Sequence, residues 1–178
     1  MKDGTAERIL ETASDLFARQ GAYGTSLGDI AKSVGISKGT LYYYYTTKQD
    51  VVDAVAKRTI SAIGDRLFAW VDTVKATDDP EKTLGDLCDA LLGDGMLLRI
   101  FIAVNNVVEP GGELEAALDN AMNEWNVMIE VGSLRMRADV ASRMKRLLAA
   151  ILPFLCGLAA LNADGDYAKE AFCALILG

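Results

Sequence analysis

The chain has no histidine among its 178 residues. Histidine is the most common general base and metal ligand in proteins, and it takes part in Ser-His and Cys-His nucleophile arrangements. Without it an enzyme would need a carboxylate pair or a lysine base, and no acidic pair stands apart from the ordinary surface acids. We therefore expect a protein that is not an enzyme and that has no metal site and no cofactor.

Cysteines and long hydrophobic runs are also scarce. Three cysteines, Cys88, Cys156 and Cys173, lie far apart among apolar neighbours without a C-x-x-C motif, which is typical of small buried side chains in a reducing compartment. The longest uncharged stretch, 147–163, has seventeen residues and contains Pro153, whereas a membrane span needs about 20 apolar residues. The amino terminus lacks the apolar core of a signal peptide. We expect a cytoplasmic protein that does not enter a membrane.

Positive charge is in deficit, since 18 Lys and Arg face 25 Asp and Glu and the net charge is -7. Taken alone, this acidity argues against nucleic-acid binding. The charge is unevenly distributed, however, because residues 1–58 carry a net charge of +1 and the remaining residues carry -8. DNA binding by the amino-terminal part is therefore not excluded, although we expect its non-specific affinity for DNA to be weak.

Apolar residues recur at helical spacing along nearly the whole chain, and no stretch shows the sustained alternation of a strand. The four residues from Ser26 and the four from Thr47 have the pattern of capping boxes, and Asp79-Pro80 places a capping acid before a first-turn proline. We predict an all-α fold of about nine helices. They extend to residue 20 and then over about 26–34, 38–44, 48–75, 80–93, 96–104, 114–132, 138–163 and 166–177.

Residues 26–44 have the pattern of a helix-turn-helix, in which two short helices are joined by Val34-Gly35-Ile36-Ser37. In DNA-binding proteins the second helix of this motif enters the major groove. The side of that helix that does not face the motif's core is free to contact DNA. The predicted core consists of Ile30, Ala31, Val34, Ile36 and Leu41.

Tyrosines occupy four consecutive positions, 42–45, on the second of these helices. We predict that one ring, that of Tyr45, packs inward with Leu41. The other rings can offer hydroxyl groups to phosphates and ring edges to thymine methyls, while Lys38, Thr40 and Lys48 supply charge and further donors. The alternative interpretation is a small helical subdomain whose surface aromatic patch contacts other proteins.

Residues 7–58 resemble the amino-terminal DNA-binding domain of the TetR (tetracycline repressor) family, above all in the runs Ser26 to Ala31 and Val34 to Tyr45 and in Lys48. The resemblance implies that the third helix reads the operator and that Lys48 clamps a phosphate. It also implies that the hydroxyls of Thr25 and Ser26 touch the DNA backbone. The residues that it assigns to the reading helix are Lys38, Gly39, Thr40, Tyr42, Tyr43 and Tyr44.

Two positions depart from that family. Tyr45 stands where the family usually has phenylalanine, which is a harmless change if the ring still packs. Gly28 stands where some members use an arginine to reach a base. The glycine weakens any assignment of base reading to the second helix.

The resemblance further implies two domains. Residues 1–47 would be the helix-turn-helix domain, followed by a connecting helix at 48–75, and residues 48–178 would bind a ligand and form a homodimer. The expected partners are an operator in double-stranded DNA, a small and mostly apolar effector, and a second copy of the chain.

Large flexible or aromatic side chains in the carboxy-terminal part are candidates for the effector pocket, with asparagines as polar contacts. The alternative is that they form an ordinary core. The candidates are Phe68, Leu91, Met96, Phe101, Asn105, Met122, Trp125, Asn126 and Met128.

The apolar residues of the last two helices are candidates for the dimer interface, with the core of the monomer as the alternative. These are Leu148, Ile151, Leu155, Leu158, Phe172, Leu175 and Ile176.

The sequence thus predicts a ligand-responsive transcriptional regulator, a repressor that its effector releases from the operator by favouring a non-binding spacing of the two DNA-binding heads. The alternative is a ligand-sensing or scaffolding helical dimer that has lost specific DNA binding. Such a protein would show no salt-dependent affinity for any duplex.

Overall fold

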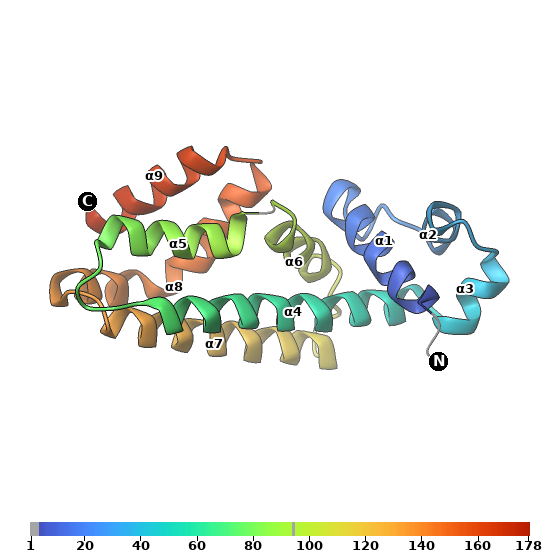
Figure 1. Ribbon diagram of the computed structural model, residues 1–178. Coiled ribbons are helices and arrows are strands. Elements are labelled where there is room, and N and C mark those ends of the chain that lie inside the picture. The colour runs from blue at the N-terminus through green and yellow to red at the C-terminus, as the bar shows by residue number, and fades with distance from the viewer. Residues whose placement is uncertain (1–3, 94) are drawn as a thin grey trace.

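The computed structural model describes residues 4–93 and 95–178, which form nine helices and no strand (Figure 1). The predicted all-α fold is therefore confirmed over the described residues. The helices are α1 (Thr5–Gln20), α2 (Leu27–Val34), α3 (Lys38–Tyr44), α4 (Lys48–Thr73), α5 (Pro80–Leu92), α6 (Leu97–Asn105), α7 (Glu113–Leu134), α8 (Ala138–Ala160) and α9 (Gly165–Leu177).

Helix α8 ends three residues earlier than its sequence pattern predicts. The chain leaves the helix through Asn162, whose φ of 51° lies in the left-handed region. The Asn162 amide donates to the carbonyl of Ala159 at 3.2 Å and the Ala163 amide donates to that of Leu158 at 3.0 Å. These bonds satisfy carbonyls at the helix end, so the apolar residues that follow Ala160 belong to a turn.

The helices surround two apolar cores that share α4 (Figure 1). Helices α1, α2 and α3 enclose the head core together with Val51 and Val55 from the start of α4 and Val104 from α6. The later part of α4 and helices α5 to α9 enclose the body core. A single uninterrupted helix therefore runs from the head into the body.

Helices α4 and α7 approach each other closely in the body. Trp70 of α4 is buried, and its ring lies against Gly132 of α7, where an added Cβ would stand 2.3 Å from the ring carbon Cζ3. The Trp70 indole nitrogen also donates to the carbonyl of Thr83 on α5 at 3.0 Å. The missing side chain at Gly132 is what allows Trp70 to link three helices.

The predicted dimer residues require a correction. Five of them, in α8 and α9, are at most 7% exposed and form part of the body core, while Leu148 and Leu175 are half-buried against it. Helix α5 packs on both α8 and α9 and covers apolar surface that the sequence leaves apparently unpartnered. The alternative, a core within the monomer, is correct for Ile151, Leu155, Leu158, Phe172 and Ile176.

The cysteines are free thiols. Burial raises the pKa of Cys88 and of Cys156 to about 11, so both thiols stay protonated near neutral pH. The described residues contain no group of three or more cysteine or acidic side chains placed to hold a metal ion. None of the described helices combines the length and the apolar character that a membrane crossing requires.

Candidate nucleic-acid interface

The start of α2 is fixed by the predicted capping box. The Asp29 amide donates to the Ser26 hydroxyl oxygen at 3.1 Å, and the Ser26 amide donates to Asp29 Oδ2 at 2.9 Å. The Ser26 hydroxyl also donates to the same carboxylate oxygen at 2.6 Å, and these bonds from Ser26 lower the pKa of Asp29. The position of the first turn of α2 is thus set by local contacts.

We expect Ser26→Ala to raise the pKa of Asp29 toward its ordinary value, because the hydroxyl bond is the largest cause of its lowering. The variant should also lose about 1 kcal/mol of stability, the usual worth of a helix N-cap. An NMR titration of the side-chain carboxyl groups measures the pKa. Asp50 is the internal control, because its pKa is lowered by the separate capping box with Thr47. An unchanged pKa of Asp29 would contradict the assignment.

Helix α3 begins in a similar way and presents one side to solvent. The Thr40 amide donates to the Ser37 hydroxyl oxygen at 3.0 Å, and the two hydroxyls are 2.8 Å apart. Lys38, Gly39 and Thr40 are all exposed. The free side of the predicted reading helix therefore exists in the structure.

Two tyrosine rings, rather than one, pack inward. Tyr45 is half-buried on the head core as predicted, and Tyr44 packs there as well. Tyr43 is 84% exposed and makes an edge-to-face contact with Tyr44 at 5.2 Å between ring centres, while Tyr42 is 52% exposed. Helical geometry explains this correction, because Tyr44 follows the fully buried Leu41 by three positions and shares its face.

The predicted phosphate contact of Thr25 also needs correction. Thr25 is 1% exposed. Its hydroxyl donates to the carbonyl of Gly21 at 2.9 Å and accepts from the Gln20 side-chain amide at 3.2 Å. These bonds occupy the hydroxyl within the loop between α1 and α2, so it holds the loop instead of facing DNA. Ser26, in contrast, is exposed.

A shallow groove of about 440 Å³ lies where the starts of α2 and α4 meet α3. We call it the α2–α3 groove. Lys38 and Lys48 both line it. The Lys48 ammonium donates to the carbonyl of Tyr23 at 3.1 Å and lies 5.9 Å from the centre of its ring. The groove is lined by Tyr23, Gly24, Thr25, Ser26, Leu27, Gly28, Lys38, Tyr42 and Lys48.

Gly28 makes room for one of these lysines. A Cβ at position 28 would stand 3.2 Å from Cε of Lys38 and 3.5 Å from its ammonium nitrogen. The Lys38 side chain thus lies over the first turn of α2, next to the position where residue 28 has no side chain. The positive group at this place comes from α3.

Tyr23 is a candidate that the sequence reasoning missed. It is 90% exposed, and it lies at the edge of the α2–α3 groove beside Lys48. An aromatic residue in a short loop between Gly21 and Gly24 could have indicated an exposed ring.

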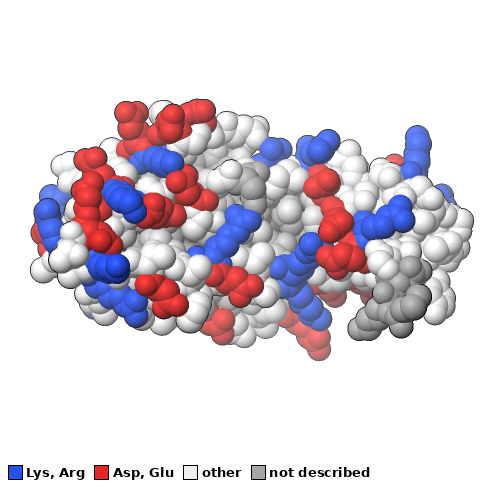
Figure 2. Space-filling view, in the orientation of Figure 1, with Lys and Arg blue, Asp and Glu red and all other residues white. Residues whose placement is uncertain are grey.

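The arrangement suits an anionic, elongated ligand. Helix N-termini attract phosphate groups through their free amides and the helix dipole. At the groove, the ammonium groups of Lys38 and Lys48 add to this attraction. Figure 2 shows acidic side chains over the body and also over α1, whereas the end of the molecule formed by α2 and α3 has a mostly uncharged surface. The groove and the exposed tyrosines of α3 are therefore separated from most of the acidic groups.

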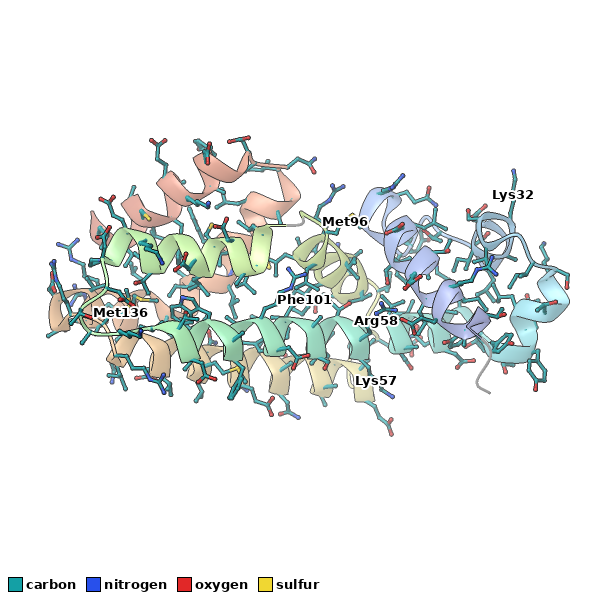
Figure 3. All side chains as sticks on the ribbon, viewed as in Figure 1. Lys32, Lys57, Arg58, Met96, Phe101 and Met136 are labelled. Carbon is teal, nitrogen blue, oxygen red and sulfur yellow. The ribbon has the colours of Figure 1, made fainter. Side chains whose placement is uncertain are left out.

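The predicted effector residues do not surround an open pocket. Phe101 and Trp125 are buried and pack edge-to-face at 5.2 Å between ring centres, and Phe101 points from α6 into the body (Figure 3). Phe68 is 61% exposed, and Asn105 also faces solvent. Both rings form part of the body core.

The remaining candidates are divided between the core and other surroundings. Leu91 is fully buried in the body core, and Met122 and Met128 pack partly buried against it. The carbonyl oxygen of the Asn126 side chain is buried without a hydrogen-bond partner. Met96 borders a separate cavity beside Arg99.

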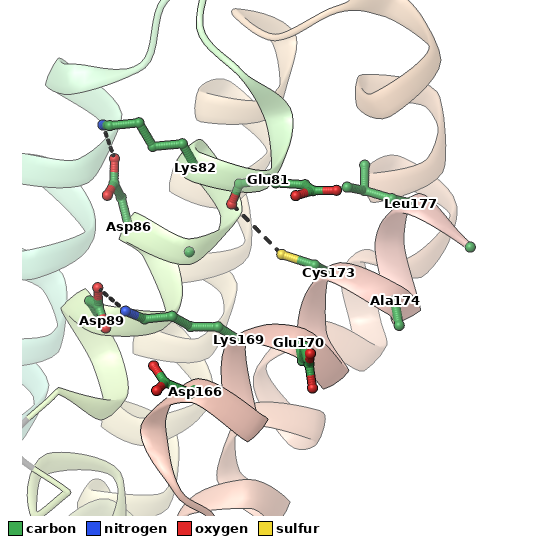
Figure 4. A pocket seen from close by; sticks show the side chains of 12 residues that line it. Glu81, Lys82, Asp86, Asp89, Asp166, Lys169, Glu170, Cys173, Ala174 and Leu177 are labelled. Carbon is green, nitrogen blue, oxygen red and sulfur yellow. Dashed lines mark hydrogen bonds and ion pairs between the residues drawn. The ribbon is translucent and has the colours of Figure 1, made fainter.

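A groove of about 830 Å³ lies between α5 and α9 (Figure 4). Two ion pairs lie in its lining, since Lys169 contacts Asp89 at 2.8 Å and Lys82 contacts Asp86 at 3.0 Å. The Cys173 thiol lies 3.7 Å from the carbonyl oxygen of Glu81. None of the predicted effector residues lines this groove.

Comparison with known proteins supports the regulatory character of the head. Residues 9–55 match the family described as bacterial regulatory proteins, tetR family. The HTH-type transcriptional regulator AcrR of Shigella flexneri is 38% identical over 83 residues, which are 47% of this chain and 38% of that protein. The HTH-type transcriptional repressor KstR2 of Mycobacterium tuberculosis is 35% identical over 80 residues, which are 44% of this chain and 38% of that protein. The chain thus spans 38% of the length of both relatives.

The likeness of the whole fold extends further than that of the sequence. A transcriptional regulator from Saccharomonospora viridis, solved in complex with choline, superposes with a TM-score of 0.72 at 22% identity. The superposition covers 96% of this chain and 94% of that one. At such identity the likeness shows the fold, which here includes both the head and the body.

Proposed function

We propose that this chain, whose residues 9–55 match the tetR family of bacterial regulatory proteins, is a transcriptional regulator that binds double-stranded DNA through α3 and the α2–α3 groove. The observation that carries the proposal is the side-by-side position of Tyr42, Lys38 and Lys48 at one groove. Aromatic rings, ammonium groups and two helix starts supply there the donors that phosphates and base edges require.

The side chains divide into two groups by their position. Lys48 and Ser26, which stand at the starts of α4 and α2, would contact phosphates. The exposed residues of α3 would face base edges in the major groove. Gly39 fits this arrangement because it lets the backbone approach the DNA closely. The residues of α3 in this role are Lys38, Gly39, Thr40, Tyr42 and Tyr43, with Tyr44 supporting Tyr43 from beneath.

We assign the regulator two domains, 1–47 for DNA binding and 48–178 for effector binding and dimerisation, connected by α4. A dimer would place two copies of α3 about 34 to 36 Å apart, the spacing of successive major grooves. We propose that the protein is a repressor and that a small effector lowers its operator affinity by favouring another spacing. The choline complex of a structural neighbour supports the binding of a small molecule by a protein of this fold.

Selection of bound duplexes from a random pool, followed by fluorescence anisotropy with the selected duplex, tests the proposal. The affinity should fall steeply with salt, because each phosphate contact releases counterions. The affinity for scrambled duplexes should be lower by about a thousandfold or more. If no duplex is enriched and no salt-dependent affinity is found, the proposal is wrong.

Gly28→Ala tests the role of Lys38 in this groove. The added methyl group would stand 3.2 Å from Cε of Lys38, so the end of this flexible side chain must shift by a few tenths of an ångström, and we expect a small loss of operator affinity. The stability should stay constant or rise by about 0.5 kcal/mol, because alanine favours helix more than glycine does. In a Lys38→Ala background the same substitution should have no further effect on affinity. Additive losses would show that Gly28 acts independently of Lys38.

A further inference from the structure

Arg99 joins the body to the head through two hydrogen bonds. From α6, its guanidinium donates to the carbonyl of Ala18 at 2.8 Å and to the side-chain oxygen of Asn162 at 2.7 Å. Ala18 lies in the last turn of α1, where carbonyls lack partners within the helix and a cation is favourable. Asn162 lies in the turn between α8 and α9. One side chain thus holds the end of α1 and that turn together.

A cavity of about 430 Å³ lies on one side of this guanidinium, and we call it the Arg99 cavity. Its apolar wall includes Leu92 of α5, Met96 just before α6, Leu158 of α8 and Ala168 of α9. A smaller cavity of about 200 Å³ is also bordered by Arg99, together with Ala18 and Phe17 of α1. The volume of the Arg99 cavity falls within the range of small-molecule sites.

The charges around the Arg99 cavity favour an anion. Among the described residues that line it there is one acid, Asp89, and it is paired with Lys169 at 2.8 Å. The Cys88 thiol stays neutral, because burial raises its pKa to about 11. Arg99 bonds here to two neutral oxygens, which do not compensate its positive charge. A carboxylate accepts stronger, charge-assisted bonds from a guanidinium than an amide oxygen does.

We propose that the Arg99 cavity binds a small monocarboxylate with an apolar body and that binding draws the guanidinium away from Ala18. The carboxylate would face Arg99, and the apolar body would lie against Leu92, Met96 and Leu158. Loss of the bond to Ala18 loosens the attachment of α1 to α6. This inference rests on the proposed function in one respect, since it names the effector class and links its site to the DNA-binding head.

Calorimetric titration of the full chain with hexanoate and benzoate tests the site without DNA. The neutral analogue hexanamide isolates the contribution of the charge. Arg99→Gln should weaken hexanoate binding at least tenfold. Arg135→Gln is the matched control, because Arg135 donates to a carbonyl at the end of α4, that of Val71, at 2.7 Å, outside the cavity. It should bind hexanoate as the unmodified protein does.

The proposal is overturned if the unmodified protein binds neither acid, if hexanamide binds as tightly as hexanoate, or if Arg99→Gln leaves binding intact.

Asn162→Gly gives an independent test, because glycine keeps the left-handed turn but removes the oxygen that competes for Arg99. Its affinity for hexanoate should rise several-fold. An unchanged or lower affinity would show that Asn162 and the acid do not compete, against the proposal.

Duplex binding then tests the link to the head. Hexanoate should lower the duplex affinity of the unmodified protein at least threefold and leave that of Arg99→Gln unchanged. The link would be disproved if hexanoate lowered the duplex affinity of the unmodified protein and of Arg99→Gln equally, or if it left the affinity of the unmodified protein unchanged. If the protein binds no duplex, the proposed function fails, while calorimetry still decides whether the cavity takes a carboxylate.

Discussion

Replacing Gly132 with alanine is expected to remove about 2 kcal/mol of the free energy of unfolding, within the range of overpacked cores. The new Cβ would stand 2.3 Å from Cζ3 and 2.6 Å from Cη2 of Trp70, so the ring or the helix must move. Trp70 has little freedom to do so, because it is 3% exposed and its indole nitrogen is bonded to Thr83 on α5. Urea unfolding followed by circular dichroism measures the change.

Gly64→Ala is the matched control for that substitution. Gly64 also lies inside a helix that packs on the body core, but its added Cβ would meet the Trp125 indole nitrogen at an ordinary 3.7 Å. The variant should gain about 0.5 kcal/mol, because alanine is the better helix former. If Gly132→Ala and Gly64→Ala change the free energy of unfolding in the same direction, the close packing of Trp70 on Gly132 is contradicted.

Tyr42→Ala and Lys48→Ala are each expected to weaken operator binding about tenfold or more, the usual effect of removing one good contact to DNA. Neither change should unfold the head, because Tyr42 is 52% exposed and the Lys48 ammonium lies at the surface of the groove. Lys48→Ala should also lower the slope of log affinity against log salt by about one, since one phosphate contact is lost. Tyr42→Ala should keep the slope and relax selectivity.

Two control substitutions distinguish the loss of a DNA contact from a general effect of removing an exposed tyrosine or lysine. Tyr167→Ala removes a tyrosine that is 61% exposed on α9, and Lys145→Ala removes an exposed lysine on α8. Both lie in the body and should leave the affinity and its salt dependence unchanged. Anisotropy titrations at several salt concentrations measure all four variants. Unchanged affinity in both Tyr42→Ala and Lys48→Ala would refute the assignment of the interface.

The helix starts could be predicted from the sequence because their causes are local. Ser26, Ser37, Thr47 and Asp79 each accept a backbone hydrogen bond from the first turn of the helix that follows them, as their spacing predicts. The residues of the head could also be assigned, because a short motif of distinctive order covers them. For this part of the chain, neighbours in sequence are also the main neighbours in space.

The interior of the body could not be predicted in the same way. Whether Trp125 lines a pocket or fills a core depends on Phe101 of another helix, and both situations require the same types of side chain. Likewise, Phe172 is covered by helices far away in the sequence. Arg99 is the one charged residue in the apolar segment 96–104, but its partners Ala18 and Asn162 are determined only by the fold.

The continuity of α4 turns small changes in the body into larger displacements of the head. At 1.5 Å per residue, its 26 residues form a rod about 39 Å long. Pivoting such a rod by about 5° about its carboxy-terminal end moves its other end by about 3 Å, close to the separation of successive base pairs. Lys48 stands at that far end, while Trp70 fastens the near end to α5 and α7. The length of α4 therefore determines how far a given rotation in the body would displace Lys48 at the head.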